Sequence, residues 1–362
     1  MVELCTNRSA REILHEMAGQ VPALDSQWQE RAVRHLDGLT KPIGSLGRLE
    51  EIAARLVCIQ QKEVLDCKNK TIYTLAADHG VSEEGVSAYP KAVTGQMVQN
   101  FLTGGAAINV LCRQFGIEVV VVDIGVDGRM DLAPGLVDRK VSNGTHNIAR
   151  GPAMEEDELA AALRVGVELA ASAAERGGAL IGTGEMGIGN TTVASAITAV
   201  LTGRPASQVT GMGTGLDSKG VERKIAVIER AIAVNHPNPS DALDILRKVG
   251  GFEIAGLTGL ILGAAARRLT VVVDGFISTA AAALACAIQP RVGGFLFAAH
   301  RSSEPGHGAL LELIGQRPLL DLEMRLGEGT GSALAMAVIE SAAKLFNEMA
   351  TFSSAHVSGA VS

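Results

Sequence analysis

The chain has 362 residues, of which 47% are hydrophobic and 20% charged, a globular composition with enough apolar material for one large domain or two. The formal net charge is −7 and no basic stripe with interleaved aromatic residues occurs, so we expect no nucleic-acid partner. The N-terminus lacks an apolar signal core and no charge-free run is long enough to span a bilayer, so we expect a cytoplasmic protein that does not enter a membrane.

The cysteines favour the same compartment. They are odd in number, are scattered along the chain and form no CxxC motif. This pattern is typical of buried or free thiols in a reducing cytosol and not of a disulfide framework. The five positions are Cys5, Cys58, Cys67, Cys112 and Cys286.

The first 65 residues are predicted to be helical. The segment 25–39 has a capping residue, Asp25 or Ser26, and its apolar residues are spaced by three and four. A turn follows, and a second helix is expected to begin near Ser45.

Strand and helix patterns alternate from about residue 70 onward. The apolar runs are continuous in Val, Ile and Leu, which indicates strands buried on both faces, and the segments between them, such as 156–177 and 278–289, have helix composition. This alternation predicts an α/β fold with a doubly wound parallel sheet, which binds its ligands at the carboxyl ends of the strands. The predicted strands are 71–78, 118–125, 178–184, 269–276 and 291–300.

The last long helix is expected at 332–352, packed back on the N-terminal helices. We therefore predict a smaller helical domain formed by residues 1–65 and 330–362. It lies beside a large α/β domain at 66–329, which carries the active site.

The stretch GEMGIGNTT, residues 184–192, is a candidate ligand site. A strand ends here, glycines turn the chain, and a helix begins near Asn190, so exposed backbone amides and the hydroxyl of Thr191 are suited to an anion. The alternative is a plain strand-to-helix turn with an Asn or Thr cap. The stretch contains one acid, Glu185, and it lacks both the full dinucleotide fingerprint and the lysine of a Walker motif.

Two further stretches, 209–224 and 300–308, have similar chemistry. Ser302 offers a hydroxyl, Gly213 a backbone amide, and Lys219 and Lys224 offer cationic groups that suit a phosphate. Each residue alone is equally consistent with a surface loop. Together with the 184–192 turn, they predict one phosphoribosyl pocket.

A second lone acid, Glu328, lies between two glycines in RLGEGTG, just before a helix. An exposed turn residue is the plain alternative. In a pocket, this acid is suited to act as a general base if burial raises its pKa toward neutrality, a shift that the nearby helix start opposes.

The histidines do not predict a metal centre. His79, next to Asp78, follows a predicted strand, but its distance from His300 and His307 in the sequence is long and no HxH or HxxxH pattern occurs. We expect hydrogen-bonded structural histidines and no metal. No nucleophile elbow or Cys–His signature is present either.

Several motifs, in chain order from about 39 to 340, resemble one family closely. They cover most of the chain and read LTKPIGSLGRLE, AADHGV, YPKAVT, GEMGIGNTT, VVVDGFIS and MRLGEGTGSALAM. The family that they resemble is the nicotinate-nucleotide–dimethylbenzimidazole phosphoribosyltransferases, which act in nucleotide-loop assembly in cobalamin synthesis.

The resemblance implies a reaction. The 5-phosphoribosyl group of nicotinate mononucleotide would pass to 5,6-dimethylbenzimidazole or a related base, with release of nicotinate and formation of α-ribazole 5′-phosphate. The pyridinium leaves without an acid and the phosphate is not cleaved, so no cofactor and no metal are implied. The family likeness also implies a homodimer with a Rossmann-like large domain and a small helical domain from both termini.

The resemblance also assigns residues. Glu328 would be the general base and Glu185 a second acid near the ribose or the reacting base. Tyr89 and Met97 would line the base slot, where some relatives have Ser and Gln. The other substrate-binding residues implied are Met186 and Leu326 in the same apolar slot, Gly187, Gly213, Lys224 and Ser302 toward the phosphate and ribose, and Asn190, Thr191 and Gly331.

Two other classes of protein fit the sequence less well. A non-catalytic nucleotide-binding protein on the same scaffold would have no need of both Glu185 and Glu328. A dinucleotide-dependent oxidoreductase is disfavoured because GxGxxG is missing, as is an acid about 20 residues after a first-strand glycine turn.

Overall fold

The computed structural model describes residues 8–128, 130 and 134–358. Within them, a parallel sheet of six strands has the order β3-β2-β1-β4-β5-β6. This is the strand order of doubly wound dinucleotide-binding folds, in which the order reverses between the first and fourth strands. The predicted α/β fold is confirmed. The strands are β1 (Lys70–Ala77), β2 (Glu118–Gly125), β3 (Leu136–Asp138), β4 (Leu180–Met186), β5 (Thr270–Val273) and β6 (Leu296–Ala298).

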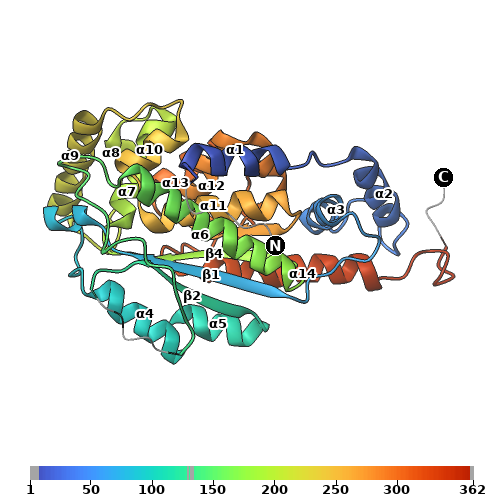
Figure 1. Ribbon diagram of the computed structural model, residues 1–362. Coiled ribbons are helices and arrows are strands. Elements are labelled where there is room, and N and C mark those ends of the chain that lie inside the picture. The colour runs from blue at the N-terminus through green and yellow to red at the C-terminus, as the bar shows by residue number, and fades with distance from the viewer. Residues whose placement is uncertain (1–7, 129, 131–133, 359–362) are drawn as a thin grey trace.

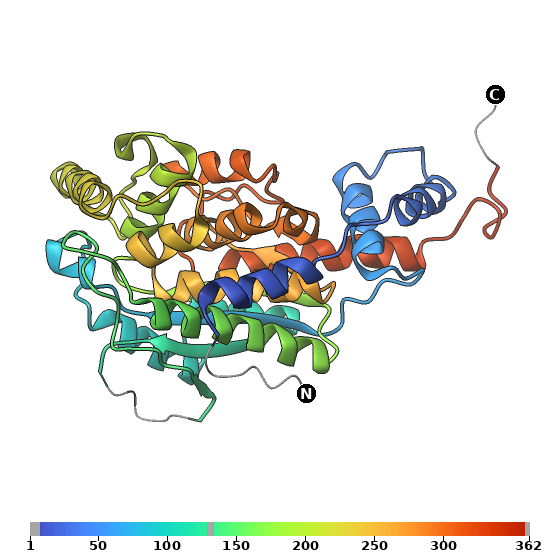
Figure 2. The ribbon, with the colours of Figure 1, turned by 45° about the horizontal axis from the view of Figure 1, so that its top comes forward.

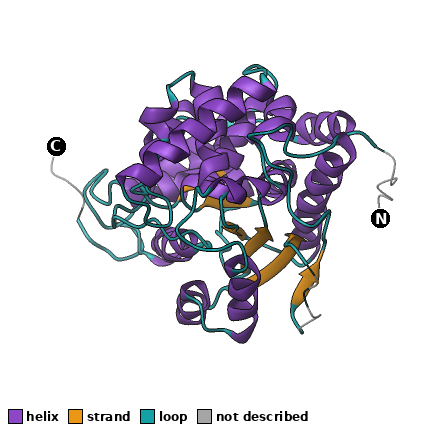
Figure 3. Ribbon diagram, turned by 90° about the vertical axis from the view of Figure 1, so that its left-hand side faces the viewer, coloured by secondary structure: helices purple, strands orange, loops and turns teal. Residues whose placement is uncertain are grey.

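Helices cover both faces of the sheet (Figures 1 and 3). On one face α4 (Val93–Thr103), α5 (Ala107–Phe115) and α14 (Thr330–Glu348) contact the strands. On the other face lie α11 (Phe252–Ala266) and α12 (Phe276–Ile288), and α6 packs outside α11. The remaining helices are α1 (Ala10–Gln20), α2 (Ser26–Asp37), α3 (Arg48–Gln60), α6 (Glu156–Glu175), α7 (Asn190–Thr202), α8 (Ala206–Val209), α9 (Ser218–Asn235), α10 (Ala242–Val249) and α13 (Pro305–Leu313), with 3-10 turns at Gly80–Glu84 and Pro290–Phe295.

The central strand β1 is buried along its whole length. A methyl group added to Gly182 in β4 would meet Ile72 and the side chains of α14, whereas one added to Gly256 in α11 would meet Leu75. Alternate residues of β1 therefore face opposite helical layers, as the continuous apolar run predicts.

Two strands differ from their predicted bounds in ways that affect the site. β4 ends at Met186, two residues later than expected, so Glu185 lies on the strand and not in the turn. The first half of the segment 291–300 is a 3-10 turn, and β6 keeps only three residues. Pro290 presets a helical φ and the adjacent Gly293 and Gly294 weaken a strand, which explains the loss. The short strand β3 was not predicted.

The helices α2 and α3 lie beside the C-terminal helix α14 at one end of the molecule (Figure 2). α2 packs on α3 and α3 on α14. His35 Nε2 lies 2.8 Å from the carbonyl oxygen of Phe346, and the amide of Leu65 donates to Asn347 Oδ1 at 2.9 Å. α1, by contrast, packs on α6 and α11 of the sheet layer. The division at residues 65 and 330 stays a prediction.

Of the described helices, none has both the length and the apolar character needed to cross a bilayer. Cys58, Cys67, Cys112 and Cys286 have free thiols. Cys5 lies outside the described residues.

The contact between α6 and α11 depends on glycine. A methyl group on Gly166 in α6 would overlap the backbone of Gly256 and Leu260 in α11. We expect Gly166→Ala to lower the free energy of unfolding by about 3 kcal/mol, because backbone atoms of a packed helix cannot yield locally. Denaturant unfolding followed by circular dichroism measures this.

Gly19→Ala is the matched control for that substitution. Gly19 also lies in a helix, α1, but nothing lies within 4 Å of an added methyl group. We expect it to gain about 0.5–1 kcal/mol because alanine is the better helix former. Equal unfolding midpoints for the two variants would contradict the close approach of α6 and α11.

Candidate active site

A cavity of about 270 Å³ lies at the carboxyl ends of β4, β5 and β6, next to the point between β1 and β4 where the strand order reverses. This is the position at which doubly wound sheets bind ligands. Nine of the residues singled out from the sequence line it: Tyr89, Glu185, Met186, Gly187, Asn190, Thr191, Gly213, Ser302 and Leu326.

Four other predicted residues, all within the described part of the chain, do not line this cavity. Lys224 lies behind Thr191, and Glu328 follows the lining residue Gly327. Gly331 donates its backbone amide to Asp274, and Met97 is half-buried on α4 against the core.

The start of α7 differs from a plain capped turn. Gly189, with φ +100°, precedes the helix, and no side chain caps it. The side chain of Asn190 points back and donates to Glu185 Oε2 instead. No side chain caps this helix start, but the amides of Asn190 and Thr192 already donate to the carbonyl oxygens of Gly187 and Gly189, so the positive end of the helix contributes more to an anion site than free amides do.

Glu185 is a buried acid on the cavity wall. It is 5% exposed, and its pKa is raised well above the usual value by burial and by the negative charges of Asp274 and Glu253, against which Asn190 acts only weakly. Burial without a cationic partner favours the neutral carboxylic acid. In that form Glu185 can donate a hydrogen bond into the cavity.

Glu328 lies in a strained turn beside this acid. Gly327, Glu328 and Gly329 all have left-handed backbones, with φ of +87°, +66° and +95°. A methyl group added to Gly184 would lie 2.5 Å from the Glu328 carbonyl oxygen, so the turn presses on β4. A non-glycine residue in this region is held there by its surroundings.

The carboxyl of Glu328 is buried and incompletely bonded. Oε2 has no hydrogen-bond partner among the described residues. Burial raises the pKa of Glu328, the backbone amide of Ile108 lowers it, and the charge of Asp274 raises it again. An ionised carboxylate here would accept a proton more readily than an exposed one.

Two cationic side chains lie at or next to the cavity: Arg325 lines it, and Lys224 lies behind the lining residue Thr191. Nζ of the fully buried Lys224 donates to Thr191 Oγ1 at 2.8 Å, and burial lowers the pKa of Lys224 to about 8 although Glu304 opposes the shift. Arg325 Nη1 donates to the carbonyl oxygen of Gly213 at 2.8 Å, and Glu304 Oε1 accepts from the Gly213 amide at 3.0 Å. Two cations and a shaped loop suit a phosphate.

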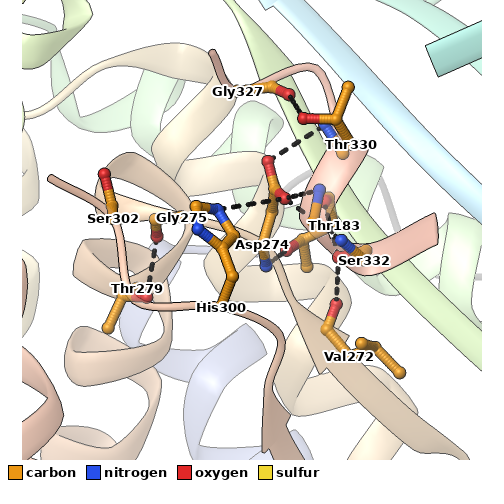
Figure 4. A network of polar contacts seen from close by, with 12 residues as sticks. Thr183, Val272, Asp274, Gly275, Thr279, His300, Ser302, Gly327, Thr330 and Ser332 are labelled. Atoms are coloured by element: carbon orange, nitrogen blue, oxygen red, sulfur yellow. Dashed lines mark hydrogen bonds and ion pairs between the residues drawn. The ribbon is translucent and has the colours of Figure 1, made fainter. Parts of the chain in front are cut away.

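Ser302 is held by a histidine in one tautomer. The Ser302 amide donates to His307 Nδ1 at 2.8 Å, and Thr279 Oγ1 donates to the Gly275 carbonyl at 2.7 Å (Figure 4). The hydroxyl proton of Thr279 is thus used, so His307 Nε2 carries the proton that bonds Thr279 Oγ1 at 3.0 Å. Burial lowers the pKa of His307 to about 3, so this ring stays neutral.

Two other buried histidines, His79 and His300, have carboxylate neighbours. His79 Nε2 lies 2.9 Å from Glu253 Oε1, both fully buried, and His300 Nε2 lies 3.8 Å from Asp274 Oδ1. Within the described ranges, no group of three or more His, Cys, Asp or Glu side chains is arranged to hold a metal ion.

Sequence reasoning missed Asp274, Glu304 and Arg325. Each stands in a stretch that was singled out, VVVDGF, HRSSEPG or MRLGEG, but no role was assigned to it. The strand-end position of Asp274 was the available signal, since ligand sites gather at carboxyl ends of parallel strands.

A larger open groove of about 1090 Å³ lies elsewhere, between α1 and α10. It is bordered by Arg11, which pairs with Asp241 on its rim. It contains none of the predicted site residues, so the cavity at the sheet edge is the better candidate.

Comparison with known proteins identifies relatives of this chain. A family model described as phosphoribosyltransferase matches residues 21–357. The nicotinate-nucleotide–dimethylbenzimidazole phosphoribosyltransferase of Geobacter sulfurreducens is 55% identical over 95% of this chain and 98% of its own length. The enzyme of the same name from Halalkalibacterium halodurans is 51% identical over 96% of this chain and 97% of its own.

A solved structure extends the likeness to three dimensions. The crystal structure of CobT from Thermus thermophilus has a TM-score of 0.89 and 46% identity, and covers 92% of this chain and 100% of its own. Likeness of this extent, with the fold and the cavity already described, identifies the family. The chain belongs to the nicotinate-nucleotide–dimethylbenzimidazole phosphoribosyltransferases.

Proposed function

We propose that this enzyme moves the 5-phosphoribosyl group of nicotinate mononucleotide to 5,6-dimethylbenzimidazole or a related base, in cobalamin synthesis. The products are nicotinate and α-ribazole 5′-phosphate. The observation that carries the proposal is that one cavity has two cationic side chains at or next to it and a buried acid on its wall, at the position where this fold binds ligands.

The phosphate of the substrate is assigned to the part of the cavity near the two cations. Its neighbours there are Lys224 and Arg325, together with the uncapped start of α7. These groups supply positive charge and the positive end of a helix without a metal. Because the phosphate is not cleaved, they only need to hold it, which fixes C1′ of the ribose relative to the incoming base.

The incoming base is assigned to the apolar wall near the cavity mouth. Tyr89 and Leu326 line this wall and are 55% and 58% exposed, and Met186 lines it further in. A flat aromatic ring gains contact area on such side chains. Met97 packs in the core behind α4, so its part in the base slot would be indirect.

The reaction that we propose needs one proton acceptor. One ring nitrogen of the base attacks C1′, and the C1′–N bond of nicotinate breaks with its electron pair moving to the pyridine nitrogen. The proton on the other ring nitrogen of the base passes to Glu328, which acts as general base. The unpartnered, buried Oε2 of Glu328 supports this assignment.

Glu185 is assigned a supporting part. As a neutral acid it would hydrogen-bond the ribose or the base from the cavity wall and leave the proton transfer to Glu328.

We also propose a homodimer, which light scattering would detect as a mass of twice 37.5 kDa.

The test is incubation with nicotinate mononucleotide and a panel of bases: benzimidazole, 5,6-dimethylbenzimidazole, adenine and a phenol. We expect base-dependent release of nicotinate, measured by liquid chromatography, and a much lower rate with nicotinate riboside, which lacks the phosphate. Binding of nicotinate mononucleotide without release under any base would favour a nucleotide-binding protein over an enzyme.

A further inference from the structure

Asp274 occupies a central position between the strands and the turn that carries Glu328. It follows directly on β5, and it is 1% exposed. Its carboxylate accepts three backbone amides: Gly329 at 3.1 Å on Oδ2, and Gly331 at 2.7 Å and Ser332 at 3.1 Å on Oδ1 (Figure 4). All three donors belong to the end of the RLGEGTG turn or the first residues of α14.

The same network includes the strand that carries Glu185. The amide of Asp274 donates to Thr183 Oγ1 on β4 at 3.1 Å. Ser332 Oγ donates to the carbonyl oxygen of Val272 on β5 at 2.8 Å. Asp274 therefore joins β4, β5 and the start of α14, with Glu185 two residues after Thr183 and Glu328 one residue before Gly329.

The turn has few other supports. Thr330 Oγ1 donates to the carbonyl oxygen of Gly327 at 2.8 Å, and Thr74 Oγ1 donates to that of Glu328 at 3.1 Å. Because Glu328 has a positive φ of 66°, which is unfavourable for an ordinary residue, the surrounding hydrogen bonds must hold it. The three bonds to Asp274 are the largest group.

We propose that Asp274 is a positioning residue for the phosphoribosyl transfer: its carboxylate fixes the strained turn and so holds Glu328 beside Glu185 at the cavity. Asp274 does not line the cavity, and it acts through Glu328. This inference rests on the proposed function only where turnover is measured, because the effect on the turn can be observed without substrate.

The charge of Asp274 supports the same conclusion. It raises the pKa of Glu185, second only to burial, and it raises the pKa of Glu328 after burial. The other titratable group facing it is His300, from the loop after β6. Burial raises the pKa of Asp274 itself, whereas His300 and the three amides lower it. Both carboxyl oxygens accept backbone amides, which favours the carboxylate form.

The test compares Asp274→Asn with Asp274→Glu and with the surface control Asp244→Asn. An asparagine has one oxygen, and its NH₂ group would face a donor amide, so at least one of the three bonds is lost. We expect Asp274→Asn to lower kcat about 30-fold or more and to change the KM of nicotinate mononucleotide by less than about threefold.

The pH profile distinguishes a positioning role of Asp274 from a purely structural one. The acid limb is the fall of kcat/KM on acidification, and removing the negative charge in Asp274→Asn should move it to lower pH by about half a unit or more. Asp274→Glu keeps the charge and disturbs only the geometry, so it should lose kcat with the acid limb in place. Asp244, paired with Lys248 on α10, should change neither quantity when replaced.

Amide hydrogen exchange of residues 327–332 is the readout without substrate. We expect at least a tenfold faster exchange in Asp274→Asn than in the wild type. Wild-type exchange rates in that variant, or lost turnover with an unmoved acid limb, overturn the inference. If Asp274→Asn does not fold, unchanged kcat in Asp274→Glu overturns it. If the wild type releases no nicotinate but Asp274→Asn still exchanges faster, the proposed function is overturned and the inference about Asp274 is not.

Discussion

Glu328→Gln is expected to lower kcat about 10³-fold and to leave the KM of nicotinate mononucleotide within about threefold. Glutamine keeps the size and the hydrogen-bonding oxygen of the side chain but cannot accept the proton of the incoming base. The substrate contacts at the phosphate end do not involve this residue, so binding should persist. Steady-state nicotinate release, together with isothermal titration with nicotinate mononucleotide, measures both quantities.

Glu185→Gln is the matched control. Burial and neighbouring carboxylates favour the neutral form of Glu185, which an amide imitates well, so we expect a loss of only about tenfold. If Glu328→Gln turns over at the wild-type rate, Glu328 is not the general base. If kcat falls more in Glu185→Gln than in Glu328→Gln, the general base is Glu185, which lines the cavity.

The pH dependence follows from the same assignment. A general base works only when it is ionised, and burial raises the pKa of Glu328 above its usual 4.5. The wild-type rate should therefore fall on acidification at a higher pH than it would for an exposed glutamate. In Glu328→Gln this acid limb should disappear from the residual activity.

The second large effect is expected at the phosphate end. Lys224→Met should lower kcat/KM for nicotinate mononucleotide about 10²-fold, mainly through KM, because a buried charged donor to the phosphate is lost. Methionine fills much of the same space, so the unfolding temperature should change little or rise, since a desolvated cation is removed. Unchanged KM would place the phosphate elsewhere in the cavity.

Lys224 also predicts an alkaline limb. Its pKa is lowered to about 8, so the free enzyme loses this charge as the pH rises through that value. Wild-type kcat/KM should fall above about pH 8, whereas kcat should fall only at higher pH because the bound phosphate stabilises the protonated lysine. Lys224→Met should show no such limb. Nicotinate riboside should react equally with the variant and the wild type.

The strands near the site could be predicted because their apolar runs are unbroken. β2 was predicted with its observed bounds, and β1 within one residue, since a strand buried on both faces needs no polar alternation. The bounds of β6 were not predicted, because a proline and two glycines place the first half of that segment in a 3-10 turn. That α1 lies apart from α2 and α3 could not be predicted either, because α1 packs against α6, a contact that no local sequence pattern encodes.

The site was predictable where a motif follows a strand. Residues from the GEMGIGNTT and HRSS stretches reach one cavity because parallel strands bring their carboxyl ends to one edge. The strand-end position of Asp274 was visible in the sequence, but its hydrogen bonds were not, because the amides that it accepts are more than 50 residues away in the chain. The inward packing of Met97 likewise depends on how α4 lies on the sheet.

If Glu328 is the general base that we propose, the three successive left-handed residues at 327–329 mark a place where the enzyme loses stability for the sake of reactivity. A chain selected only for stability would place Gly or Asn at position 328, since both accept that backbone more readily than Glu. It would also avoid burying a carboxyl oxygen without a partner. Any route to a hardier enzyme that relaxes this turn would therefore tend to lead to a well-folded protein with an idle site.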